Sequence, residues 1–156
     1  MTNINRRSFL KGTATSSALG IAIGAGLLKP GQVFAAWPQS SFEAKNVEDA
    51  LKALYQSAAT TPNADINIKA PDIAENGAVV PITVSTNLAA EEISVIVEKN
   101  PSPLAGTFMM TASTVGYVST RVKMGKTSKL IAVVKAGGKL HSAEKEVKVT
   151  IGGCGG

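Results

Sequence analysis

The alternation of apolar and polar side chains in short segments constrains the fold of this chain more than any other feature. From Ile66 onward, β-branched and other apolar residues recur mostly at every second position, as is typical of strands with one buried face. The segments are 66–68, 79–84, 93–97, 107–111, 117–122, 130–134 and 147–151. Turn-forming pairs such as Asn76-Gly77 and Gly137-Gly138 separate them. The pattern predicts an all-β chain of about seven strands arranged as a β-sandwich.

One segment before the strands has a helical period. Asn46 precedes Val47-Glu48-Asp49, so that a potential N-cap is followed by two acidic residues that complement the helix dipole. Apolar residues recur mainly at intervals of three and four, and they are Phe42, Val47, Leu51, Leu54, Tyr55 and Ala58. We expect a short N-terminal helix that lays one apolar stripe against the sheet and is ended by Thr61-Pro62.

Proline interrupts one of the predicted strands. Pro81 lies within the apolar run 79–84 and removes a backbone donor from the sheet ladder. Proline is tolerated at a sheet edge or at a bulge. We therefore place this segment near an edge, where a second sheet-forming protein could also dock.

Basic charge is concentrated at the N-terminus. The chain carries 16 Lys and Arg against 11 Asp and Glu, a formal net charge of +5. Four of the basic residues, Arg6, Arg7, Lys11 and Lys29, lie in the first 35 residues, which contain no acid. The remainder, with 12 basic and 11 acidic side chains, is nearly neutral. This distribution argues against a nucleic-acid-binding surface.

The first 36 residues have the organisation of a cleavable export signal. Arg6-Arg7 followed by Phe9-Leu10-Lys11 resembles the twin-arginine motif, and a mild apolar stretch over 12–28 comes next. This stretch is too short and too rich in small and polar residues to span a membrane stably. We expect cleavage after Ala35 or Ala36, export to the periplasm, and a mature form without a membrane segment. A retained amphipathic helix is the alternative.

The chain contains one cysteine, Cys154, with Gly152 and Gly153 before it and Gly155 and Gly156 after it. Four glycines offer no side chains for packing and are costly to order, so we expect the thiol on a flexible, exposed arm. Cys154 lies three residues beyond Ile151, a reach of about 10 Å. The predicted organisation is thus a signal peptide over 1–36, a sandwich domain over 37–150 and an arm over 151–156.

Nothing in the arm activates the thiol. It has no cation or helix N-terminus, and the terminal carboxylate follows two residues later, which opposes thiolate formation. The chain shows no spacing typical of a metal or cofactor site, and His141 is its one histidine. We therefore predict no catalytic residue, no metal and no cofactor, and a covalent substrate on Cys154 that partner enzymes process.

Three other functions fit parts of the sequence. The chain could be an exported interaction module that forms an intermolecular disulfide through Cys154. It could be a sulfur-transfer protein with Gly155-Gly156 activated as a thiocarboxylate, or an enzyme with His141 as the base for Cys154.

Several stretches resemble one known family. The C-terminal run from Val147 to Gly156, with the ending Gly-Gly-Cys-Gly-Gly, is similar to the substrate-carrying arm of SoxY proteins, the sulfur carriers of the Sox thiosulfate-oxidising system. The stretches 97–105 and 119–124, Phe108 and the twin-arginine leader also resemble this family.

The resemblance implies an immunoglobulin-like domain that pairs with the β-protein SoxZ and is exported with it. It also implies a cycle in which a haem enzyme conjugates thiosulfate to the arm cysteine and a hydrolase releases sulfate. In some organisms a molybdenum enzyme then oxidises the remaining sulfane sulfur. Carried over to this chain, the covalent role falls on Cys154, and Gly152, Gly153, Gly155 and Gly156 form the arm.

Overall fold

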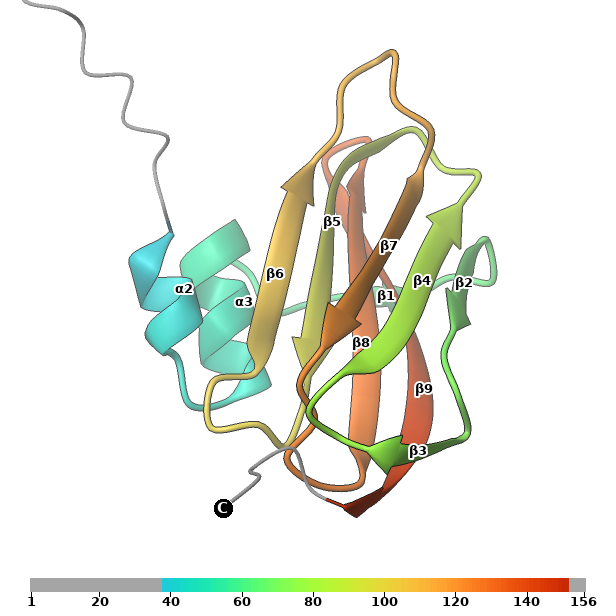
Figure 1. Ribbon diagram of the computed structural model, residues 1–156. Helices are drawn as coiled ribbons and strands as arrows, with labels where there is room; N and C mark the ends of the chain where they lie inside the picture. Colours follow the sequence, from blue (N-terminus) through green and yellow to red (C-terminus); the bar gives the residue numbers. More distant parts are fainter. Residues whose placement is uncertain (1–37, 152–156) are drawn as a thin grey trace, which may run out of the picture. The chain divides into compact units, whose positions relative to one another are not determined.

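The computed structural model describes residues 38–151 (Figure 1). Arg6 and Arg7 of the predicted signal, and the arm with Gly152, Gly153, Cys154, Gly155 and Gly156, lie outside the described residues. Two helices come first, α2 (Gln39–Glu43) and α3 (Val47–Tyr55). The strands are β1 (Thr61–Pro62), β2 (Ile66–Lys69), β3 (Ile73–Asn76), β4 (Val80–Thr86), β5 (Ala90–Val97), β6 (Leu104–Met109), β7 (Tyr117–Val122), β8 (Ser128–Ala136) and β9 (Lys139–Ile151).

The strands form two sheets that face each other. The larger sheet has the order β1-β9-β8-β5-β6, and β3 also pairs with β9; the smaller sheet has the order β2-β4-β7. The largest fully buried side chains between them include Ile82 and Val84 from the smaller sheet and Ile93 and Leu130 from the larger one. The predicted β-sandwich is confirmed, with each of the seven expected strands present.

Two strands were not predicted, and one is longer than expected. β1 and β3 have two and four residues and pair with β9 in parallel. β9 begins at Lys139, whereas the sequence predicted it only from Val147, because residues 139–146 are mostly polar. A two-residue turn explains the extra length: Gly137 and Gly138 have φ values of 56° and 71°, which the right-handed twist of a tight hairpin favours. Ala136 is thereby paired with Lys139, and the ladder continues to Val147.

The helices cover the outer face of the larger sheet (Figure 1). A second apolar cluster joins Ala50 and Leu51 of α3 to Ile96 of β5 and Val133 of β8. Strands β5 and β8 are therefore buried on both faces, whereas an ordinary sandwich strand is buried on one. The predicted apolar stripe of the helix is confirmed in this contact.

The ends of helix α3 agree with the prediction on one side only. Asn46 caps the N-terminus, since its Oδ1 accepts a hydrogen bond of 2.8 Å from the amide of Asp49. The helix ends at Tyr55, and Gln56 takes a left-handed conformation with φ of 60° and donates its amide to the carbonyl of Lys52. Thr61-Pro62 was wrongly predicted as the stop, since these residues form β1 instead.

The strand with Pro81 is not an edge strand, because β4 lies between β2 and β7. The placement near an edge is correct only locally. The pairing of β2 with β4 ends at Lys69 opposite Thr83, so at Pro81 the neighbouring strand is β7 alone. The absence of an amide hydrogen at Pro81 therefore removes no hydrogen bond from the pairing of β2 with β4.

A chain of hydroxyls links helix α3 to the sheet. The Tyr55 hydroxyl lies 2.6 Å from Ser94 Oγ, which donates to Thr107 Oγ1 at 3.0 Å. Thr107 Oγ1 in turn donates to the carboxylate of the buried Glu92 at 2.5 Å. Burial of the Tyr55 ring raises the pKa of its hydroxyl, because the charged phenolate would be poorly solvated there.

This raised pKa predicts a loss of stability at alkaline pH. Above pH 10.0, the ordinary tyrosine value, the unfolded chain releases the Tyr55 proton while the folded chain retains it. The free energy of unfolding should thus fall as pH rises through this range. Urea denaturation at pH 7 and 10.5 should show a smaller fall for Tyr55→Phe than for the wild type. The exposed Tyr117 provides the control variant Tyr117→Phe, and an equal fall in both variants would contradict the assignment.

Gly116 allows a close approach between the loop before β7 and the end of β4. A Cβ added at Gly116 would lie 2.7 Å from the carbonyl oxygen of Thr86, whereas one at Gly125 would meet nothing nearer than Asn100 Oδ1 at 3.8 Å. We expect Gly116→Ala to lower the free energy of unfolding by about 1 to 3 kcal/mol. Gly125→Ala should leave it unchanged or raise it slightly, because alanine restricts the unfolded chain. Equal midpoints in thermal denaturation would argue against this close contact.

Candidate functional site

The last four residues of β9 extend past the strand that pairs with the rest of it. β8 pairs with β9 only as far as Ser128 opposite Val147. Beyond this point β3 takes over as the neighbour and pairs in parallel, with Ile73 opposite Lys148 and Asn76 opposite Ile151. The arm with Cys154 continues from this extension, so the site is built on residues 148–151.

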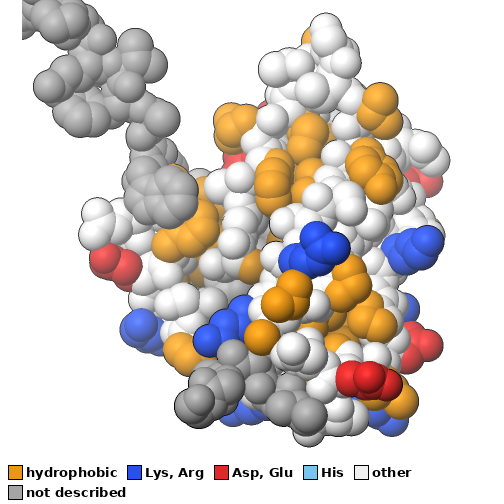
Figure 2. All heavy atoms as spheres, in the orientation of Figure 1, with side chains coloured by type: hydrophobic (Ala, Val, Ile, Leu, Met, Phe, Trp, Pro, Cys, Tyr) orange, Lys and Arg blue, Asp and Glu red, His pale blue; other side chains and the backbone are white. Residues whose placement is uncertain are grey.

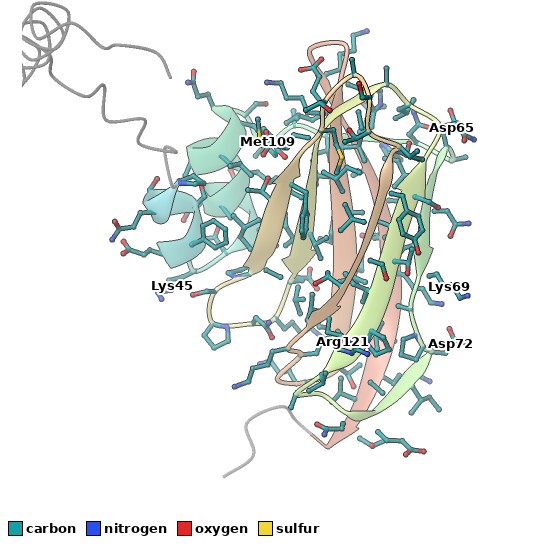
Figure 3. All side chains as sticks on the ribbon, turned by 45° about the horizontal axis from the view of Figure 1, so that its top comes forward. Lys45, Asp65, Lys69, Asp72, Met109 and Arg121 are labelled. Atoms are coloured by element: carbon teal, nitrogen blue, oxygen red, sulfur yellow. The ribbon has the colours of Figure 1, made fainter. Side chains whose placement is uncertain are left out.

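Strand β3 holds the extension through backbone and side-chain contacts. The Lys148 amide donates to the carbonyl of Asp72 at 2.9 Å, and Thr150 Oγ1 donates to the carbonyl of Glu75 at 3.2 Å. The Asp72 side chain, labelled in Figure 3, also forms an ion pair with Lys145, which lies earlier in β9. Lys145 Nζ is 3.0 Å from Asp72 Oδ1. The start and the end of β3 are thus both tied to β9.

Ordered loops surround the base of the extension. The Met124 amide donates to the carbonyl of Gly77 at 2.7 Å. Asn100 bridges the next loop by donating to the carbonyl of Lys123 at 2.7 Å and accepting from the amide of Gly125 at 3.1 Å. The turn after β3, the loop after β5 and the loop after β7 therefore meet at one end of the sandwich.

The surface at this end combines apolar and basic side chains. Ile73 and Val79 are 57% and 52% exposed, and Lys123 and Lys126 are also exposed. Figure 2 shows Lys and Arg side chains beside hydrophobic ones at the lower end of the face in view. The exposed apolar side chains are of a kind that protein interfaces bury, whereas lysine is depleted at such interfaces.

Covalent geometry limits where the predicted attachment residue can lie. Cys154 follows Ile151, the last described residue, by three positions, so its Cα stays within about 10 Å of the end of β9. The end of β9 therefore fixes the centre of the region that Cys154 can reach.

His141 is too distant to act on Cys154 of the same chain. It lies within β9, opposite Val134, and its Nδ1 is 3.4 Å from Nδ2 of Asn63. Ten residues of extended strand separate His141 from Ile151, a distance of about 33 Å. An enzyme that uses His141 as the base for Cys154 does not fit this geometry.

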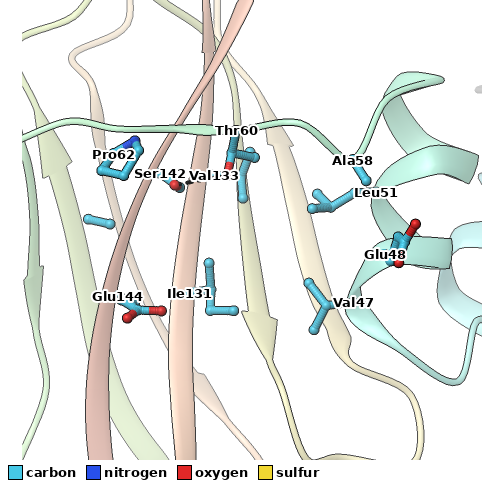
Figure 4. A pocket seen from close by; sticks show the side chains of 11 residues that line it. Val47, Glu48, Leu51, Ala58, Thr60, Pro62, Ile131, Val133, Ser142 and Glu144 are labelled. Carbon is cyan, nitrogen blue, oxygen red and sulfur yellow. Dashed lines mark hydrogen bonds between the residues drawn. The ribbon is translucent and has the colours of Figure 1, made fainter.

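A groove in the described part of the chain lies away from the end of β9. It has a volume of about 650 Å³ and lies between α3, the segment through Thr60 and the outer face of β8 and β9 (Figure 4). Its floor is apolar, with Leu51, Ile131 and Val133, and Ser142 donates a hydrogen bond of 3.0 Å to Thr60. Its two acids, Glu48 and Glu144, pair with lysines, so no reactive group converges here.

Residues 38–151 contain no group of three His, Cys, Asp or Glu side chains that could hold a metal ion. Among the helices in this part of the chain, none is long and apolar enough to cross a membrane.

Strand β3, which holds the end of β9, was not predicted from the sequence. β3 escaped prediction because it has only four residues, alternates imperfectly and gains its partner from the distant β9. The Asn76-Gly77 turn was recognised, and an Asn-Gly turn often joins two strands. That turn is the signal that could have indicated β3.

Comparison with known proteins agrees with the resemblance at the C-terminus. The family model for sulfur oxidation protein SoxY matches residues 51–154. The structure of the sulfur carrier protein SoxY from Chlorobium limicola f thiosulfatophilum matches with a TM-score of 0.63 and 43% identity, covering 73% of this chain and 100% of that one. The comparison with curated proteins gave no match.

Two further solved structures match weakly. They are the β-glucuronidase of Bacteroides uniformis and its β-glucuronidase 2 bound to a cyclophellitol aziridine, both with 13% identity and a TM-score of 0.39. The matches cover 55% and 57% of this chain and 11% of each enzyme, and they carry no conclusion. The two SoxY matches, by contrast, span most of the sandwich. They show that the chain belongs to the SoxY family of sulfur-carrier proteins.

Proposed function

We propose that Cys154 is the covalent attachment point for sulfur intermediates during the oxidation of thiosulfate. The observation that carries this proposal is the position of Cys154, three residues past the end of β9, in a chain whose family match extends through residue 154. A thiol in this position can enter the active site of another protein while the sandwich remains outside.

The chemistry is supplied by partner enzymes. His141 is about 33 Å from the end of β9. The arm itself contains no group that would lower the pKa of the thiol. The chain is thus a carrier that enzymes act upon, and it has no reaction and no cofactor of its own.

The reaction sequence balances with a single cysteine. A haem enzyme joins the Cys154 thiol to thiosulfate through a new S–S bond, with release of one proton and two electrons to the haem. A hydrolase then adds water and releases the terminal sulfone as sulfate, which leaves a persulfide on Cys154. A molybdenum enzyme oxidises this remaining sulfur in organisms that possess one.

The carrier works in the periplasm as a complex with SoxZ. Arg6 and Arg7 in the leader support export by the twin-arginine route, which takes folded proteins and is therefore compatible with a preassembled pair. A partner lacking its own leader would be carried across in this complex.

The central prediction concerns the mass that a sulfur adduct adds to the protein at Cys154. Protein from the periplasm of cells grown with thiosulfate should carry added sulfur, as sulfane or thiosulfonate, that is absent from Cys154→Ser. Intact-mass and peptide mass spectrometry would locate the adduct. An adduct that persists in Cys154→Ser, or sulfur on the carboxyl of Gly156, would refute the assignment. A disulfide dimer alone, with no adduct after growth on thiosulfate, would favour the interaction module.

A second prediction concerns the intrinsic reactivity of the thiol. Cys154 should react with iodoacetamide at neutral pH within about twofold of the rate of a free cysteine peptide, because the arm provides no activating group. His141→Gln should leave this rate unchanged. A much faster reaction in the wild type, or a slower one in His141→Gln, would show that the chain activates its own cysteine.

A further inference from the structure

We infer that Thr127 and strand β3 form a clasp on residues 148–151 of β9, and that Thr127 is a positioning residue for Cys154. This inference rests on the proposed function, since it concerns how the carrier holds its thiol. The clasp decides how far along β9 the ordered strand extends toward Cys154.

The need for a clasp follows from the geometry of strand pairing. In a strand, successive amides point to opposite sides. Toward β3, the Lys148 amide has the carbonyl of Asp72 as its acceptor. The Val149 amide points to the other side, where β8 would be, but the pairing with β8 has already ended at Val147.

Thr127 fills the missing position. Its Oγ1 accepts the Val149 amide at 3.0 Å, although Thr127 itself lies in the loop just before β8. A side-chain oxygen thus supplies a rung that the backbone of β8 no longer provides. With β3 on one side and Thr127 on the other, the extension is held from both directions.

The clasp sets the length of chain between the ordered strand and Cys154. With β9 held up to Ile151, three residues, 152–154, span this distance; release at Val149 makes it six, 149–154. The effective concentration of a tethered group falls as about the −3/2 power of the length of its tether. Release would therefore lower the effective concentration of Cys154 near the sandwich about threefold. By holding the extension, Thr127 keeps the thiol on a short tether.

The experiment compares Thr127→Val, which has nearly the same shape but no acceptor, with Thr127→Ser, which retains the hydroxyl. Thr83→Val is the matched control, because its hydroxyl bonds Ser119 at 3.3 Å in the other sheet. In the full mature chain, NMR should show that hydrogen exchange at the Val149 amide is about fivefold faster in Thr127→Val than in the wild type. Thr127→Ser and Thr83→Val should have the wild-type exchange rate. An unchanged exchange rate would overturn the clasp, and circular dichroism would verify folding.

A second measurement tests the positioning role directly. Cys154 is the sole cysteine, so a spin label on it can be paired with one at Lys139→Cys, at the opposite end of β9. Double electron–electron resonance should give a broader distance distribution in Thr127→Val than in the wild type or Thr127→Ser. Equal widths in all three would overturn the positioning role. Both measurements need no sulfur loading, so failure of the carrier function would be recognised separately by the absence of an adduct.

Loading by the partner enzymes is the functional consequence. With limiting carrier, sulfur loading of Thr127→Val should be about threefold slower, while alkylation by iodoacetamide stays unchanged. Equal loading rates in Thr127→Val and Thr83→Val would overturn the link between the clasp and delivery of the thiol.

Discussion

The pairing of β8 with both of its neighbours is the interaction on which the rest of the structure depends. β8 pairs with β5 on one side and with β9 on the other along nearly its whole length. Leu130 and Val134 face the smaller sheet, whereas Val133 faces the helices. Because β8 contributes to both apolar clusters and pairs with β9, it fixes β9 relative to the two clusters. The root of the arm inherits this fixed position.

The groove and the end of β9 lie on different parts of the fold. The groove contains two acids, Glu48 and Glu144, that pair with lysines, whereas at the end of β9 the Asp72 carboxylate pairs with Lys145. In the proposed function, the described residues position the thiol, and the proteins that receive it supply the reactivity.

Local signals in the sequence predicted much of this structure. The Gly137-Gly138 turn, the Asn46 cap and the β7 segment were found because each depends on residues adjacent in the chain. The short strands β1 and β3 were missed, since their pairing with β9 is set by tertiary contact. Thr127 carried no signal at all: its role depends on an amide 22 residues away. The prediction that Cys154 carries sulfur came from the resemblance at the C-terminus and not from periodicity or composition.

The parallel pairing of β3 with β9 has a mechanical consequence. A pull on the chain beyond Ile151 would act along the axis of β9. Inter-strand hydrogen bonds lie across the strands, so this load shears the β3 and β8 ladders and strains their bonds together, whereas a load across the strands would open them singly. The end of β9 is therefore suited to resist a pull along its own axis without unravelling the fold.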